Sequence, residues 1–182
     1  MARKKLLGTA LAVYATMAGI AVLWSLISGR PLFWIDRPPS LGSVALWFVI
    51  GALGGIAVVV LSRHFLDQFR WAQSLADWFA EVLGPISWKE ALALALLSGF
   101  AEEMLFRGAL QASLGLIPAT IIFGLCHWPP RKELRPWTIM TGVLGLLFGL
   151  ATVWSGHLTA AIVAHFVINF INLTEIGKMS KS

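Results

Sequence analysis

The sequence is poor in charge and in cysteine. Only 13% of its 182 residues are charged, and its single cysteine is Cys126, whereas soluble domains have about 25% charged residues. A lone cysteine cannot form an intrachain disulfide, so nothing in the sequence calls for an oxidising compartment. The scarcity of charge excludes an ordinary soluble globular protein.

Apolar residues make up the difference. The chain is 58% hydrophobic with a mean hydropathy of +0.78, which predicts an integral membrane protein in contact with membrane lipid. No polar stretch is long enough to fold separately, so we expect a single integral membrane domain over residues 1–182. The formal net charge of +5 does not indicate a nucleic-acid partner, because the basic residues cluster at the ends of apolar segments.

The apolar runs predict an all-α, polytopic transmembrane bundle. Six membrane-embedded helices are expected, at residues 6–27, 41–61, 88–114, 119–128, 137–153 and 158–173. Polar residues recur at helical spacing over residues 65–83, which predicts an amphipathic helix lying in the interface plane. The first segment is longer than the core of a signal peptide, about 7–15 residues, so we interpret it as an uncleaved span, with a cleaved signal peptide as the alternative.

Two local patterns refine this prediction. Ser87 and Glu90 have the spacing of a capping box, which places a helix start near Trp88. The segment 119–128 is shorter than the ~20 residues of a full crossing, so partial penetration stays open for it. Two glycine stripes, Gly51/Gly54/Gly55 and Gly142/Gly145/Gly149, would let neighbouring helices approach closely.

The distribution of basic residues predicts the topology. If all six helices cross, most basic residues share one side of the membrane, opposite Arg30 and Arg37; they are Arg3, Lys4, Lys5, Arg63, Arg70, Lys89, Arg131, Lys132, Arg135, Lys178 and Lys181. The positive-inside rule then places both termini in the cytoplasm. The short, compact chain favours a prokaryotic cytoplasmic membrane.

Two adjacent carboxylates lie near the middle of the segment 88–114. A carboxylate at mid-membrane depth costs at least about 2.5 kcal/mol, so Glu102 and Glu103 need a reason to be there. Arg107 follows Glu103 by four residues and lies on the same helical face, where an ion pair would offset much of that cost. Glu102 points about 100° away. We therefore interpret Glu103 and Arg107 as support and Glu102 as the reactive carboxylate.

Further polar side chains are expected at a similar depth. At about 1.5 Å per residue, His127 returns to the level of Glu102 on the next helix. His165 lies well inside the last segment, and Asn169 follows one turn later on the same face. These groups suit amide hydrolysis: Glu102 and His127 would activate water and pass on its proton, and His165 and Asn169 would stabilise the oxyanion.

The same residues resemble the motifs of a known family. Glu102-Glu103-x-x-x-Arg107, Phe123-x-x-x-His127 and His165-x-x-x-Asn169 are similar to the three motifs of the CPBP, or Abi, intramembrane endopeptidases, which are related to the Ras-converting CAAX endopeptidase. The resemblance covers about residues 88–173, the protease-like core, and no motif matches before Trp88. It implies a glutamic-type CAAX protease fold and activity, water activation by Glu102 and His127, and an oxyanion site at His165 and Asn169, with Phe123 in a supporting position.

Other interpretations of these residues remain open. The carboxylates and histidines are also good zinc ligands, so a zinc-dependent membrane protease is the alternative to a cofactor-free enzyme. A structural ion-pair network, or a non-enzymatic membrane immunity or transport factor, would use buried charges too. Cys126 beside His127 does not indicate a Cys-His nucleophile, because adjacent helical residues diverge by about 100°. His64 and His157 are expected at the interface.

The sequence thus predicts an intramembrane endopeptidase that acts near the membrane face on a membrane-anchored or lipidated protein. It does not specify whether that substrate is prenylated.

Overall fold

The computed structural model describes residues 2–179, with side chains from residue 6 onward. Lys181 and the side chains of Arg3, Lys4 and Lys5, which entered the topology prediction, lie outside this description. In chain order the elements are α1 (Ala2–Ser28), α2 (Leu41–Gln68), α3 (Arg70–Leu83), α4 (Trp88–Glu103), the π-helix η1 (Met104–Gln111), α5 (Ala112–Leu114), α6 (Leu116–Cys126), the 3₁₀ turn η2 (Lys132–Leu134), α7 (Pro136–Ser155) and α8 (Thr159–Met179).

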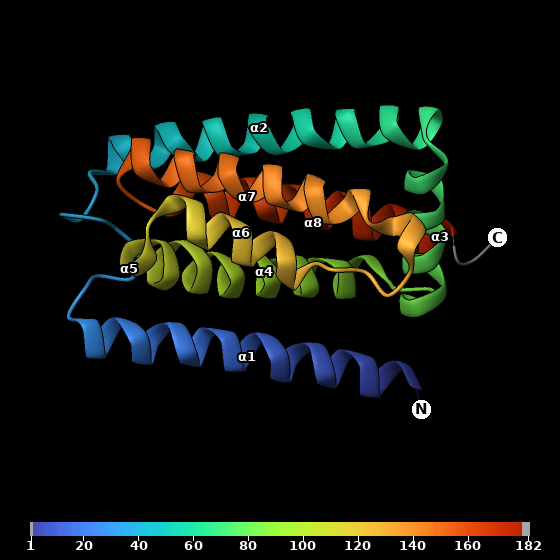
Figure 1. Ribbon diagram of the computed structural model, residues 1–182, viewed down its shortest axis with the longest axis horizontal. Helices are drawn as coiled ribbons and strands as arrows, with labels where there is room; N and C mark the ends of the chain where they lie inside the picture. Colours follow the sequence, from blue (N-terminus) through green and yellow to red (C-terminus); the bar gives the residue numbers. More distant parts are fainter. Residues whose placement is uncertain (1, 180–182) are drawn as a thin grey trace.

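The long helices lie side by side along one axis, and α3 crosses them at one end (Figure 1). The two ends of the described chain lie at the α3 end of the bundle. The link between α1 and α2, the α5–α6 turn and the α7–α8 turn lie at the other end (Figure 1). The predicted helical membrane bundle is therefore confirmed.

Four helices are long and apolar enough to cross a membrane: Leu6–Ser28, Leu41–Gln68, Lys132–Ser155 and Thr159–Met179. The rod from Trp88 to Leu114 is missing from this set because it carries Glu102, Glu103 and Arg107, and α6 is a shorter apolar helix of 11 residues. That these two elements also cross the membrane, which would bring the crossings to the predicted six, therefore remains a prediction.

The start of α6 differs from its predicted position. The break that was expected over residues 115–118 is confined to Gly115, whose φ of 89° is a conformation that only glycine adopts readily. Pro118 does not interrupt the helix because it lies in the first turn, where its missing N–H has no intrahelical partner to lose. The end of α6 also differs from the prediction of Trp128: the helix ends at Cys126, and His127 caps it with non-helical backbone angles.

The amphipathic helix was predicted over residues 65–83, and this start was wrong. α2 continues through Gln68, and the helix breaks at Phe69, whose backbone is extended. The amphipathic element α3 therefore begins at Arg70, with Ala72 and Ala76 buried against the bundle. The capping box that starts α4 is confirmed, because Glu90 N–H donates to Ser87 Oγ and Ser87 N–H donates to the Glu90 carboxylate.

The rod that carries the glutamates is π-helical from Met104 to Gln111. Such wide turns occur frequently at functional sites, and no feature of the sequence predicted this one. Gly108 lies within it and contacts the α1–α2 link so closely that an added Cβ would meet Leu32 O at 2.4 Å. The link therefore packs directly on the rod.

α8 is the central helix of the bundle and packs against α2, α3, α4 and α7. Its buried residues Ala161, Ala164 and Ile168 form a core with Val59 and Phe148. The glycine stripe of α2 makes this packing possible, as predicted for Gly51 and Gly55, whose added Cβ atoms would lie 2.5 Å from Ala160 O and 2.9 Å from Val167 Cβ. A Cβ added at Gly54 would meet nothing within 4 Å, so the prediction that this glycine lets another helix approach closely was wrong.

At the end opposite α3, the α1–α2 link pairs with the α7–α8 turn. Trp34 and His157 form an antiparallel bridge, flanked by Ile35 N–H to Gly156 O at 2.8 Å and Leu158 N–H to Phe33 O at 3.1 Å. His157 was predicted as an interfacial residue, but it is only 2% exposed. It is buried because the α1–α2 link covers the turn.

Candidate active site

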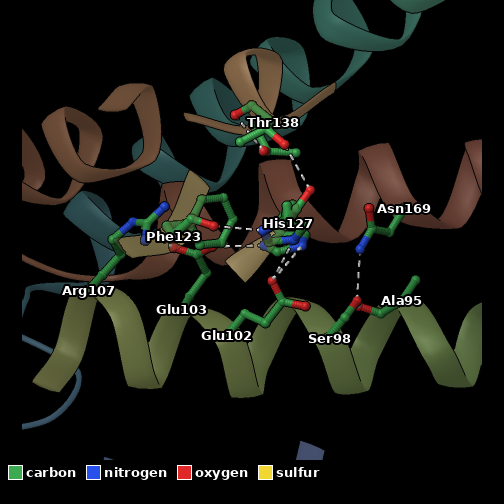
Figure 2. Close-up of polar contacts among 11 residues, drawn as sticks. Ala95, Ser98, Glu102, Glu103, Arg107, Phe123, His127, Thr138 and Asn169 are labelled. Carbon is green, nitrogen blue, oxygen red and sulfur yellow. Dashed lines mark hydrogen bonds and ion pairs between the residues drawn. The ribbon is translucent and has the colours of Figure 1, made fainter. Parts of the chain in front are cut away.

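Glu102 lies between two histidines that come from different helices. Its Oε2 is 3.7 Å from His127 Nε2 and 3.9 Å from His165 Nε2. Figure 2 shows Glu102 on α4 facing His127 at the end of α6, and His165 comes from α8. These distances are too long for direct hydrogen bonds, but a single small molecule such as water could contact all three groups.

His127 is held from two sides at the end of α6. Its Nδ1 lies 2.8 Å from Phe123 O, and since a carbonyl only accepts, Nδ1 carries the proton and the Nε2 of the neutral ring has a free lone pair. Thr138 Oγ1 donates to His127 O at 3.1 Å. Trp137 approaches the imidazole edge-to-face, with ring centroids 5.5 Å apart. The Nε2 lone pair therefore faces Glu102.

Glu103 is fully buried, and its carboxylate contacts the guanidinium of Arg107 and the imidazole of His165. Its Oε2 lies 3.3 Å from Arg107 Nε, and its Oε1 lies 2.8 Å from His165 Nδ1. The ion pair with Arg107 is the arrangement predicted from the i, i+4 spacing. The contact with His165 was not predicted, because it depends on how α8 is rotated relative to α4. Glu103 thus links the arginine to one of the two histidines.

The guanidinium of Arg107 lies in an aromatic cage. Its Cζ is 4.5 Å from the ring centroid of Phe123 and 5.9 Å from those of Phe106 and Phe148, distances at which cation–π attraction is favourable. Apart from the ion pair with Glu103, its nitrogens are buried without a hydrogen-bond partner among the described residues. Gly145 makes room for the cage, since an added Cβ would lie 2.8 Å from the Phe123 ring. This matches the expectation that the second glycine stripe lets α7 approach the site.

Asn169 lies one turn after His165 on α8 and contacts α4. Its Nδ2 donates to Ser98 Oγ at 2.8 Å, and Figure 2 shows its amide nitrogen directed at α4 and its oxygen directed away. Ser98 is one turn before Glu102 on the same rod. The contact of Asn169 with the rod therefore lies one helical turn from Glu102.

Two polar contributors to the site were not identified from the sequence: Ser98 and Thr138. Ser98 had a usable signal, because it precedes Glu102 by four residues and lies on the same face of the rod. α1 packs against α4 and η1, a contact for which its distance in sequence offered no indication. α1 therefore takes part in enclosing the site.

A cavity of about 460 Å³ opens at the end opposite α3, under the α1–α2 link. Arg107 and Gln111 line its inner wall, and Arg30 and Asp36 contribute from the link. Gln111 Nε2 donates to Gly149 O at 3.0 Å, while its Oε1 has no hydrogen-bond partner in the described part of the chain. Glu102 and the two histidines are not part of the lining, so the cavity lies behind Arg107 rather than at the cluster.

The zinc alternative depends on how the potential metal ligands are grouped in the structure. Within residues 2–179, no three His, Cys, Asp or Glu side chains are arranged as a group that could hold a metal ion. Cys126 is exposed and is the terminal residue of α6.

Fold and site together define a polytopic helical membrane protein with a buried cluster of carboxylates and imidazoles. Residues 84–171 match the family described as type II CAAX prenyl endopeptidase Rce1-like, so the chain carries an Rce1-like domain that includes Ser98, Glu102, His127, His165 and Asn169. This confirms the family predicted from the three motifs. The helices α1 to α3 precede the matched region.

One curated relative is the uncharacterized protein YpbD of Bacillus subtilis (strain 168). It is 41% identical to this chain over 85 residues, which are 46% of this chain and 43% of the relative. The chain therefore spans less than half the length of the curated relative it matches. No solved structure matches the chain significantly.

Proposed function

We propose that this chain is an intramembrane endopeptidase of the glutamic type, which hydrolyses a peptide bond of a membrane-anchored or lipidated protein and uses no metal or other cofactor. The observation that carries the proposal is the position of Glu102 Oε2, 3.7 Å from His127 Nε2 and 3.9 Å from His165 Nε2. The family of endopeptidases matched at residues 84–171 supports the reaction class.

In the proposed reaction a water molecule lies between Glu102 and His127. The Glu102 carboxylate takes a proton from this water as its oxygen bonds to the carbonyl carbon of the peptide. The proton passes to His127 Nε2, which is free to accept it because Nδ1–H is bound to Phe123 O. His127 then protonates the leaving nitrogen as the C–N bond breaks. The products are a carboxylic acid and an amine.

His165 and Asn169 would bind the oxyanion that forms in the intermediate. Because His165 Nδ1 faces the Glu103 carboxylate, a second proton on Nε2 is needed for donation to the oxyanion. We infer that His165 works as an imidazolium, whose charge Glu103 balances together with that of Arg107. With Glu102 ionised, the four charges of the cluster cancel.

The test compares the membrane proteomes of cells that express the wild-type protein, Glu102→Gln or Glu81→Gln, with new peptide termini mapped by mass spectrometry. Glu81 is the matched control, since its carboxylate is exposed and pairs with Arg131 at the surface. We expect a C-terminal or juxtamembrane cleavage that is present with wild type and Glu81→Gln and absent with Glu102→Gln. Retained cleavage with Glu102→Gln would refute the glutamic mechanism.

Metal independence is tested on the purified protein. We expect activity to survive chelators and the zinc content to be well below one ion per chain. Loss of activity on chelation and its return with zinc would establish the zinc protease instead. Reconstituted protein that moves protons or solutes but cleaves no peptide would favour a transport role.

A further inference from the structure

We propose that Ser98 is a positioning residue that fixes the carboxamide of Asn169 with its N–H groups toward the reacting atoms. This inference rests on the proposed function and adds a residue to its oxyanion site.

The hydrogen bonds of Ser98 have a defined direction. Ser98 is 2% exposed, and its hydroxyl donates to Ala95 O at 3.3 Å. A hydroxyl has one proton, so once this proton is directed to Ala95 the oxygen can only accept from Asn169. The amide nitrogen of Asn169, rather than its oxygen, must therefore face α4.

This orientation determines what Asn169 can offer to a substrate. One N–H of the carboxamide binds Ser98, which leaves the second N–H for a substrate, and in this proposal it is directed toward the reacting atoms beside Glu102. If the amide rotated by 180°, its oxygen would face the developing oxyanion and repel it. A donor aligned before the reaction lowers the barrier because it needs no reorganisation in the transition state.

A purely structural role would look different. Serine within a helix commonly bonds back to a carbonyl of the preceding turn, and the Ser98–Ala95 bond is of this kind. Ser62 on α2 makes the same kind of bond, to Val58 O at 2.9 Å, and no interhelical hydrogen bond is found for it within residues 2–179. Ser98 differs from Ser62 because its oxygen also receives the Asn169 N–H from another helix.

The experiment measures kcat and KM in detergent with a fluorogenic peptide that spans the cleavage site mapped by the terminal proteomics above. The variants are Ser98→Ala, Ser98→Thr, Asn169→Ala and the double variant Ser98→Ala/Asn169→Ala, with Ser62→Ala as the matched control. Removal of one oxyanion donor costs about 100-fold or more in kcat, which is the loss expected for Asn169→Ala. Loss of orientation alone in Ser98→Ala should cost less, roughly tenfold, with KM nearly unchanged.

Three further results are expected. Ser98→Thr keeps the hydroxyl and restores most of kcat. Ser62→Ala behaves like wild type. In the Asn169→Ala background, the Ser98→Ala substitution has no additional effect, because there is no carboxamide left to orient.

The outcomes separate this inference from the proposed function. If Asn169→Ala lowers kcat while Ser98→Ala does not, or if the two losses multiply in the double variant, the role of Ser98 is refuted and the proposed function stands. If Asn169→Ala leaves kcat unchanged, the oxyanion assignment fails and the role of Ser98 fails with it.

Discussion

At the scale of single residues, Glu103 links Arg107 on its own helical rod to His165 on α8. Glu103 and Arg107 were predicted to pair because their spacing alone brings them to one helical face. The contact between Glu103 and His165 could not be predicted, because it depends on the rotation and depth of a helix 62 residues further along the chain. The direction of the Asn169 amide depends in the same way on Ser98.

Substitution of Glu103 should therefore lower the free energy of unfolding more than substitution of an exposed carboxylate. In Glu103→Ala the guanidinium of Arg107 remains buried with no opposite charge beside it, which costs about 3–5 kcal/mol for a buried pair. Glu81→Ala breaks only a surface pair with Arg131 and should cost about 1 kcal/mol or less. Thermal unfolding of the purified proteins in detergent measures both; equal midpoints for the two variants would contradict the assignment of Glu103 as support.

A second residue-scale prediction concerns His157, outside the spans. Its Nδ1 accepts from Thr159 N–H at 3.4 Å, and its Nε2 lies 3.1 Å from Ser43 Oγ, so the imidazole is neutral. Burial lowers the pKa of His157 below its ordinary value of 6.5. The unfolded chain then binds the proton more readily, so this contribution to stability is complete above about pH 6.5 and declines as the pH falls toward the lower folded pKa.

The measurement is the thermal midpoint in detergent between pH 7.5 and pH 5. We expect the wild-type midpoint to fall over this range more steeply than that of His157→Asn, whose amide oxygen can accept from Thr159 N–H without titrating. Identical slopes for the two proteins would show that the packing of the α1–α2 link on the α7–α8 turn does not depend on His157 being neutral.

At the scale of elements, the sequence predicted the presence of each helix better than the residues at which the helix begins and ends. Apolar runs and the capping box placed each rod, because burial in lipid and satisfied amides act locally. The boundary between α2 and α3 and the start of α6 depend on single backbone conformations, at Phe69 and Gly115. The π-helix that contains Arg107 had no signal in the sequence.

The glycines of α2 give a prediction at this scale. An alanine at position 51 would place its Cβ 2.5 Å from Ala160 O, a backbone atom that cannot move without shifting α8. The same substitution at position 54 meets nothing within 4 Å and gains about 0.5–1 kcal/mol of helix propensity. We expect Gly51→Ala to lower the midpoint of thermal unfolding and Gly54→Ala to leave it unchanged or raise it. The opposite order would show that α2 and α8 do not pack as described.

At the scale of the whole molecule, both ends of the described chain lie at the end where α3 crosses the bundle (Figure 1). The exposed basic side chains of Arg70, Arg131 and Lys132 belong to α3 and to the loop before α7, at that same end. We propose from the positive-inside rule that this end, with both ends of the described chain, faces the cytoplasm.

Topology reporters test this orientation. A reporter that is active only outside the cytoplasm should be inactive when fused to either terminus and active when inserted in the α1–α2 link, for example after Arg37. Fluorescence from a cytoplasmic reporter at both termini provides the complementary signal. Termini on opposite sides would mean that α6, or the rod from Trp88 to Leu114, does not cross.

The shortness of α6 has a consequence for the bilayer itself. At 1.5 Å per residue, its 11 residues give an apolar wall of only about 16 Å, whereas the hydrocarbon core is about 30 Å thick. The exposed side chains Ile117, Ile121 and Leu125 form that wall, and below them Trp128, with Arg135 5.1 Å from its ring, is the kind of pair that lies among headgroups. If α6 crosses, the bilayer beside it thins to match this wall. The membrane surface would then be drawn inward on the side of the molecule where His127 lies.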